Sequence, residues 1–223
     1  MSNKDKSLDA LNQKVVKDVI KETQTSEGHL DDSQYEVLST KEIIKPSPVF
    51  SVWEKKIKTP TGIITRQVVY HSDSVVAGIY RPAGGNSLEV LVTEEYRSGT
   101  GRVTKALVAG LVNDGEVPED ALEREVWEEA GININPTYAK KVATIVSSEG
   151  FTNEHVHIFS VPVTHDVKLG KQSLDSDEYL KVHWEPLKKL LDLAKRGEIV
   201  SAPTIIFLQD LHNGLLSVGS KVY

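Results

Sequence analysis

The feature that most constrains this chain is a crowded group of acids in the segment 110–132, GLVNDGEVPEDALEREVWEEAGI. Glu125, Glu128 and Glu129 stand at positions i, i+3 and i+4. On a helix this spacing places all three carboxylates on one face, with neighbouring Cβ atoms ~5–6 Å apart. Like charges so close raise each other's pKa unless a cation lies among them. Because Mg²⁺ binds through one or two carboxylates together with substrate phosphates, the segment predicts a metal platform for a phosphorylated substrate.

The residues around these acids predict where the helix lies and what role one arginine has beside it. A proline and two acids at its start and a glycine after its end predict a helix over 118–130. Arg124 stands four residues before Glu128 and eight after Glu116. Its planar fork can therefore hold a carboxylate on the helix and another on the preceding loop, which indicates an orienting role.

Composition excludes several classes of protein. The chain has 223 residues, 39% of them hydrophobic, so it can form one full domain with appendages. A net charge of −6 argues against a broad nucleic-acid-binding surface. The absence of cysteine excludes disulfides, thiolate zinc sites and cysteine nucleophiles. No apolar run approaches the ~18 residues of a membrane span and no signal peptide is visible, so we expect a cytoplasmic protein without a membrane partner.

Hydrophobic patterning divides the chain into four parts. Residues 1–34 form an N-terminal extension, with an amphipathic helix at 8–20 and a polar linker, and we expect the helix to dock on its own domain or on a partner subunit. Residues 35–73 contain three extended runs that predict a small antiparallel β segment. Residues 74–213 alternate strands and helices, and 214–223 form a C-terminal tail.

The alternation within 74–213 predicts an α/β or α+β domain, with a mixed sheet covered by helices. Besides the acidic helix, we expect helices near 186–196 and 203–212. The expected strands are 74–80, 88–96, 141–147, 155–163 and 179–184.

The acidic segment also matches a known pattern at every position. It reads Gly, five residues, Glu, seven residues, then Arg-Glu-apolar-any-Glu-Glu-any-Gly-apolar, which is the Nudix box. The chain is therefore identified as resembling the Nudix hydrolases. Over residues 35–211 it is similar to the ADP-ribose and ADP-sugar pyrophosphatase branch, through the shorter motifs EEYR, LVAG, SSEGFTNE and GEIVSAPTI.

The resemblance implies a fold and a reaction. The fold is a Nudix-type α/β/α sandwich with a mixed sheet, whose N-terminal β segment is often exchanged across a homodimer. The reaction is hydrolysis of the pyrophosphate bond in a nucleoside diphosphate linked to another moiety, with ADP-ribose or an ADP-sugar giving AMP and a sugar phosphate. The cofactor is Mg²⁺, with Mn²⁺ as a substitute, and two or three ions polarise the phosphates and lower the pKa of a bound water.

The resemblance also implies roles for residues of the acidic segment. Carried over by position, Glu125 and Glu129 ligate the metal, the backbone carbonyl of Ala109 is a further ligand, and Glu128 assists as ligand and catalytic residue. We expect these four residues to come together at one end of the domain.

Further residues take substrate and catalytic roles by the same resemblance. Glu154 is the general base or a further metal contact, and Arg124 supports catalysis. Arg97 faces the diphosphate, Arg66 reaches the substrate from the N-terminal sheet, and Gly110 lets the backbone approach the substrate closely. Each of the outer residues has a simpler reading: Arg97 pairs with an acidic neighbour, Arg66 is an exposed strand residue, and Glu154 is a solvated loop acid.

Two departures from the branch leave the substrate open. Ala106 stands where the branch commonly has glutamate, and Glu149 stands where its loop has proline. An acid at position 149 adds negative charge near a diphosphate or adds a metal ligand. Two alternatives to nucleotide-sugar hydrolysis follow: sanitation of modified nucleoside triphosphates, or a non-catalytic Nudix-fold ligand sensor.

Overall fold

The computed structural model describes residues 36–44, 49–85, 87–176 and 178–219. The amphipathic helix predicted at 8–20 lies outside these ranges. Within them, no helix is long and apolar enough to cross a membrane.

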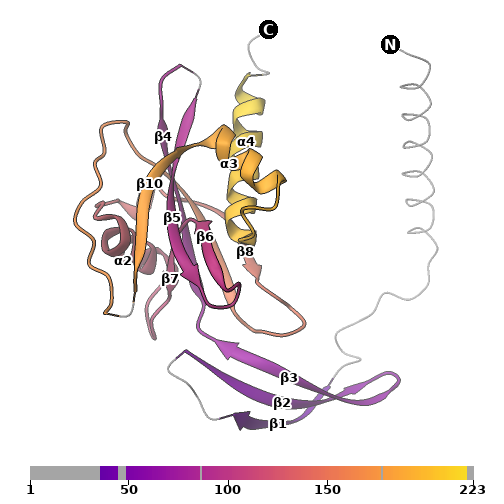
Figure 1. Cartoon of the computed structure of the whole chain (residues 1–223). Helices are drawn as coiled ribbons and strands as arrows, with labels where there is room; N and C mark the ends of the chain where they lie inside the picture. Colours follow the sequence, from indigo (N-terminus) through magenta and orange to yellow (C-terminus); the bar gives the residue numbers. More distant parts are fainter. Residues whose placement is uncertain (1–35, 45–48, 86, 177, 220–223) are drawn as a thin grey trace, which may run out of the picture. The chain divides into compact units, whose positions relative to one another are not determined.

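The predicted N-terminal β segment is confirmed as a three-stranded sheet in the order β1-β2-β3 (Figure 1). Its strands are β1 (Glu36–Ile44), β2 (Phe50–Thr59) and β3 (Gly62–His71). The chain divides into two compact units, and the division crosses this sheet: Lys55–Arg66 groups with the residues up to Lys41, while Glu42–Glu54 groups with Gln67 onward. The acidic helix and the cleft beside it belong entirely to the second unit.

The main sheet is mixed, as the sequence predicted. Its central path runs β10-β5-β4-β9-β8, with β6 paired to β5 and β7 paired to β4. β4 and β9 pair in parallel, and the other described pairs are antiparallel. The strands are β4 (Ser74–Pro82), β5 (Leu88–Arg97), β6 (Arg102–Ala106), β7 (Val108–Leu111), β8 (Lys140–Val146), β9 (His155–Pro162) and β10 (Leu180–Pro186).

The central strands are buried on both faces, because helices cover both sides of the sheet. β4 reads as a near-continuous apolar run, which is typical of such a strand. Val75 and Ile79 belong to one hydrophobic cluster, and Val76 belongs to the other. The register of β4 against β9 sets Ser74 level with Val156, so the N-terminal ends of these two central strands lie side by side.

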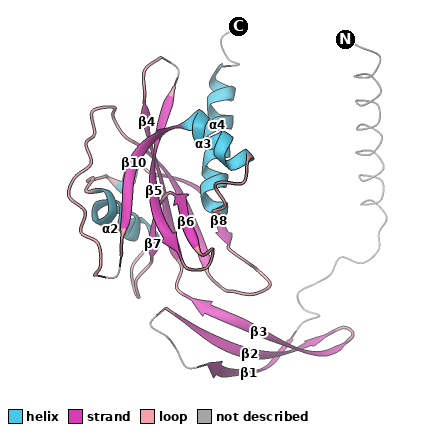
Figure 2. Ribbon diagram, in the orientation of Figure 1, coloured by secondary structure: helices cyan, strands magenta, loops and turns pink. Residues whose placement is uncertain are grey.

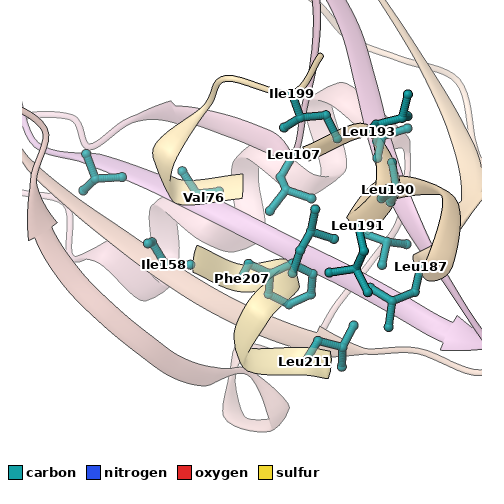
Figure 3. Packing of buried hydrophobic residues seen from close by; sticks show 14 residues of the cluster. Val76, Leu107, Ile158, Leu187, Leu190, Leu191, Leu193, Ile199, Phe207 and Leu211 are labelled. Atoms are coloured by element: carbon teal, nitrogen blue, oxygen red, sulfur yellow. The ribbon is translucent and has the colours of Figure 1, made fainter. Parts of the chain in front are cut away.

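Helix α2 (Pro118–Ala130) covers one face, and α3 (Leu187–Lys195) and α4 (Ala202–Gly219) cover the other (Figure 2). α2 buries Leu122 and Val126 in the first cluster. In the second cluster, Leu190 of α3 and Phe207 of α4 are fully buried against the sheet (Figure 3). Full burial of a side chain such as Phe207 contributes roughly 1.5–3 kcal/mol. This arrangement confirms the predicted α/β/α sandwich.

Four elements differ from the sequence prediction. β6 and β7 were not predicted, because they are short and partly exposed, and their pairing with β5 and β4 decides their conformation. A 3-10 turn at Pro136–Tyr138 was also missed. The last helix was predicted to end near 212, where an Asn-Gly pair follows, but α4 continues to Gly219. Once buried residues anchor a helix, each added residue costs little, so one glycine does not end it.

Candidate active site

The acidic helix forms at the predicted residues because signals at both of its ends agree. Pro118 occupies its first turn, and Val117 before it is extended. Gly131 follows the last turn at φ 62°, a left-handed conformation that glycine adopts without strain, and its N–H donates to the carbonyl of Trp127. In the loop before the helix, the side chain of Glu116 accepts a hydrogen bond from the N–H of Asn113 at 2.9 Å.

Arg124 makes the contacts that its spacing predicted. Its Nε and Nη2 donate to the two carboxylate oxygens of Glu116, each at 3.0 Å. Its Nη1 donates to Glu125 at 2.6 Å and to Glu128 at 3.0 Å. Nη2 also donates to the carbonyl of Leu111 at 2.8 Å. Hydrogen bonds from Arg124 hold the pKa of Glu116 below its ordinary value. The arginine thus joins the loop, strand β7 and two acids of α2 into one network.

Among the acids of α2, Glu129 has the surroundings that least favour a negative charge. Its side chain is 5% exposed, and its Oε2 has no hydrogen-bond partner within the described residues. Burial, with the nearby charge of Glu125 second, raises its pKa to about 9. Burial also raises the pKa of Glu125, although Arg124 acts in the opposite direction. A buried acid with an unpartnered oxygen ionises readily only beside positive charge, which a bound cation would supply.

The backbone beside these acids leaves room for them. A Cβ atom added at Gly110 would lie 1.9 Å from the carboxyl carbon of Glu125, so any larger residue there would displace that carboxyl. The N–H of Ala109 forms a hydrogen bond with Glu129. No three acidic or histidine side chains converge as a ready metal site in the part of the chain that the structure describes, since Arg124 holds Glu125 and Glu128.

Oxygen atoms are the ligands that a hard divalent cation prefers. The predicted ligands, which are the carboxylates of Glu125, Glu128 and Glu129 and the carbonyl of Ala109, stay a prediction. The unpartnered oxygen of Glu129 fits such a cation, and the missing side chain at Gly110 makes room for the carboxyl of Glu125.

A cleft of about 330 Å³ adjoins this donor set, since Ala109 lines it. Arg97 and Glu154, both predicted site residues, also line the cleft, as does Ala106. The Nη2 of Arg97 pairs with Glu95 at 2.9 Å, so the simpler reading of this arginine also holds. The structure therefore brings Arg97, Glu154, Ala109 and the acids of α2 to one region of the second unit.

Glu154 lies at the end of a loop that is tied to neighbouring strands. Its Oε1 accepts a hydrogen bond from the hydroxyl of Ser74 at 2.8 Å, and its Oε2 accepts one from Ser147 at 2.9 Å. His71 Nδ1 lies 3.9 Å from the same Oε1. The N–H of Val69 donates to the carbonyl of Phe151 in this loop at 2.9 Å. Glu154 is thus a held carboxylate rather than a freely solvated one.

Two further residues singled out from the sequence, Arg66 and Glu149, are not among the residues that line the cleft. Arg66 is exposed on β3, and its Nη1 donates to the carbonyl of Thr65 at 2.9 Å. It belongs to the first unit, so its predicted substrate contact stays a prediction. Glu149 is exposed in its loop.

Sequence reasoning missed an acid and the segment that carries it. The loop after β9 covers the C-terminal end of α2 with three hydrogen bonds to successive carbonyls: from Ser173 N–H to Glu128, from Gln172 Nε2 to Glu129, and from Gly170 N–H to Ala130. Farther along the loop, the charge of Glu178 raises the pKa of both Glu125 and Glu129. No local pattern marks Glu178, because only the path of this loop brings it near the helix.

Comparison with known proteins agrees with this site. The NUDIX domain family model matches residues 70–206, more than half of the chain. The ADP-ribose pyrophosphatase of Bacillus subtilis is 27% identical over 172 residues, 77% of this chain and 89% of that protein. That of Escherichia coli K12 is 33% identical over 113 residues, 49% of this chain and 53% of that protein. The GDP-mannose pyrophosphatase of Salmonella arizonae is 28% identical over 104 residues, 47% of this chain and 53% of that protein. Since the matched residues contain the acidic helix, its arginine network and the adjoining cleft, the chain belongs to the Nudix hydrolase family.

Proposed function

We propose that this chain hydrolyses the pyrophosphate bond of a nucleoside diphosphate joined to a sugar. ADP-ribose or an ADP-sugar is the proposed substrate, and AMP and a sugar phosphate are the products. The observation that carries this proposal is the buried, unpartnered Oε2 of Glu129 beside a cleft, because it needs a cation where a diphosphate can reach it. Relatives named ADP-ribose pyrophosphatase and GDP-mannose pyrophosphatase support a nucleotide-sugar substrate.

Nudix hydrolases generally use a divalent metal, and here we propose Mg²⁺, with Mn²⁺ able to replace it. When bound, such an ion polarises the phosphates and makes water a better nucleophile. Glu125 and Glu129 would hold it, with Glu128 and the carbonyl of Ala109 contributing further oxygens. Gly110 leaves the space that this arrangement requires.

The two arginines have different proposed roles. Arg124 orients Glu125 and Glu128 through the bonds that also tie it to Glu116. Arg97 lines the cleft and would neutralise part of the charge of the diphosphate. Since Arg97 already pairs with Glu95, its guanidinium is held in place before substrate arrives.

Two carboxylates outside α2 are candidates for taking the proton of the attacking water. Glu178 acts electrostatically on both Glu125 and Glu129. Glu154 is held by two hydroxyls in the cleft wall. Glu154, as the sequence predicted, or Glu178 would take this proton. Loss of a general base typically lowers kcat by about 10²–10⁴-fold, so whichever of Glu154→Gln and Glu178→Gln removes the base should lower kcat in that range on every substrate.

The family resemblance further supports a homodimer and a substrate contact from Arg66. Light scattering coupled to gel filtration tests the first point. For the second, Arg66→Ala should raise KM with little change in kcat, because the contact binds substrate away from the reacting phosphorus.

Phosphorus NMR with a panel of compounds tests the proposal. The panel contains ADP-ribose, ADP-glucose, UDP-glucose, dinucleoside polyphosphates and nucleoside triphosphates, each with Mg²⁺ and with chelator, and Glu129→Gln serves as control. Mg²⁺-dependent release of AMP from ADP-ribose, lost in the variant, is the expected result. Turnover of triphosphates alone would assign the chain to nucleotide sanitation. Tight binding of a compound without turnover would instead assign it to ligand sensing.

A further inference from the structure

The C-terminal end of α2 is covered by another part of the chain. The last four carbonyls of any α-helix have no partner inside the helix. Here all four accept hydrogen bonds from residues beyond Ala130. Gly131 N–H donates to the carbonyl of Trp127, and the other three carbonyls accept from the 163–179 loop, which joins β9 to β10. This loop therefore takes the place that water or a capping side chain has at other helix ends.

One of the three bonds comes from a side chain. The Nε2 of Gln172 donates to the carbonyl of Glu129 at 2.8 Å. The other two come from backbone N–H groups, from Ser173 at 2.7 Å and from Gly170 at 2.9 Å. A substitution can remove the side-chain bond and leave the backbone donors unchanged. Gln172 is therefore the residue through which this attachment can be weakened selectively.

The loop also contacts the helix end through two glycines. A Cβ atom added at Gly170 would lie 2.5 Å from the carbonyl oxygen of Gly131. A Cβ atom added at Gly131 would lie 2.5 Å from the Cα atom of Gly170. In both cases the obstacle is a backbone atom, which cannot rotate aside as the end of a side chain can. Any side chain at position 170 would thus lift the loop from the helix.

Glu178 lies between this attachment and the main sheet. Residues 170–173 are held on α2, and Leu180 begins β10. Between these points the chain makes a turn, in which Glu178 N–H donates to the carbonyl of Asp175 at 3.1 Å. Asp175 N–H in turn donates to the Oε2 of Glu178 at 3.3 Å. The place of the Glu178 carboxylate therefore depends on where the loop is attached.

The charge of Glu178 acts on the acids of the site. It raises the pKa of both Glu125 and Glu129. In the metal-free protein this charge opposes their ionisation, whereas a divalent cation bound by the same acids is stabilised by each negative charge nearby. Because the Coulomb energy falls as charges separate, affinity for a cation depends on how closely the loop holds Glu178 to the helix.

We propose that Gln172 is a positioning residue for Glu178. Its bond to the carbonyl of Glu129, together with the glycine contact at position 170, holds the charge of Glu178 beside the acids of α2 and so strengthens metal binding. The inference rests on the proposed metal-dependent hydrolysis and adds a residue on which the affinity for the metal depends. Gln172 acts through Glu178 and not on the reacting atoms.

Binding of Mn²⁺ tests this proposal without turnover. The electron paramagnetic resonance signal of free Mn²⁺ gives the dissociation constant for the full chain in the absence of nucleotide. Glu178→Gln should weaken Mn²⁺ binding by about 10- to 100-fold, as the loss of other partners of metal ligands does. Gln172→Met keeps a long side chain that has no N–H to donate. It should weaken Mn²⁺ binding by about 3- to 10-fold, because the net loss of one hydrogen bond loosens the attachment.

A double variant separates the positioning of Glu178 from a direct effect on α2. In the Glu178→Gln background, Gln172→Met should change Mn²⁺ binding by less than about twofold, because the charge that Gln172 positions is gone. Gly170→Ala should weaken binding at least as much as Gln172→Met, and its effect should also disappear in that background. Gln209→Ala is the matched control, since Gln209 is exposed on α4, across the main sheet from α2. It should bind Mn²⁺ like the wild type.

Three results would overturn the proposal. Equal losses in both backgrounds would show that Gln172 acts on the helix itself. Unchanged Mn²⁺ binding by Gln172→Met, with its fold checked by circular dichroism, would show that the bond positions nothing of consequence. If Glu178→Gln binds Mn²⁺ like the wild type while Glu129→Gln does not, the loop has no part in metal binding, although the proposed reaction stands. If the wild type binds no Mn²⁺, the inference fails, and cleavage of a nucleotide sugar then decides whether the proposed function fails with it.

Discussion

Replacing Gly110 with alanine should inactivate the site while leaving the fold largely intact. The added Cβ would lie 1.9 Å from both the carboxyl carbon and the Oε1 of Glu125, and 2.3 Å from its Oε2. Real Cβ contacts are almost never shorter than 3.0 Å, so one side must move. Gly110 pairs with Val75 in the β7–β4 ladder, whereas the carboxyl of Glu125 is the far end of a flexible side chain. The carboxyl therefore moves.

The size of the effect follows from this displacement. Restoring an ordinary contact shifts the carboxyl of Glu125 by about 1–1.5 Å, and forcing a side chain off its rotamer costs about 0.5–1.5 kcal/mol. The 2.6 Å bond from Arg124 to Glu125 is strained or lost with it. Misplacement of a reacting geometry by ~1 Å can cost ~10²-fold in rate. Gly110→Ala should therefore lower kcat/KM for ADP-ribose by about 10²–10³-fold and the free energy of unfolding by only about 1 kcal/mol.

Two measurements check this prediction. AMP release from ADP-ribose with saturating Mg²⁺ gives the activity, and urea denaturation in chelator gives the stability. Gly99→Ala is the matched control, because a Cβ there meets nothing within 4 Å. Wild-type activity in Gly110→Ala would refute the reasoning, since Glu125 would then not be needed where the structure places it.

Three further predictions concern stability and the acidic network. Burial raises the pKa of Glu129 to about 9, above its ordinary 4.5, so metal-free wild type should lose stability as pH rises between those values. In chelator, the free energy of unfolding of Glu129→Gln should rise relative to that of the wild type by at most about 1.4 kcal/mol per pH unit over that interval. A difference between the two proteins in urea denaturation that does not change with pH would contradict this. Gly78→Ala places a Cβ 2.2 Å from the buried ring of Phe207. It should lower the free energy of unfolding by about 1–3 kcal/mol, while the protein that remains folded stays active. An unchanged urea midpoint would show that the ring moves aside without cost. Arg124→Lys loses the paired bonds to Glu116 and should lower Mg²⁺ affinity or kcat by about 10–100-fold, whereas an unchanged Mg²⁺ titration and rate would show that charge alone suffices.

Much of the site could be predicted from the sequence, because its central helix carries its signals locally. The first-turn proline and the glycine at 131 defined α2, and the i, i+3, i+4 spacing placed its acids on one face. The contacts of Arg124 with Glu116 and Glu128 also followed from spacing alone. Such features depend on residues within eight positions of one another, so a single sequence contains them.

The features that were missed depend on contacts between distant parts of the chain. Strands β6 and β7 form because longer neighbours accept their hydrogen bonds. Ser74 meets Glu154 only because β4 and β9 pair in parallel with their first residues level. Glu178 acts on the helix only because the preceding loop turns back over its C-terminal end, where Gly170 packs on Gly131. Neither Ser74 nor Glu178 belongs to a pattern that the sequence displays.

The most direct test of the account is the rate of AMP release from ADP-ribose by the wild type and by Glu129→Gln, each with Mg²⁺ and with chelator. We expect turnover by the wild type only with Mg²⁺, and a loss of about 10²-fold or more in the variant although it remains folded. Turnover that persists in chelator, or that survives in Glu129→Gln, would contradict the claim that this buried acid holds the catalytic metal.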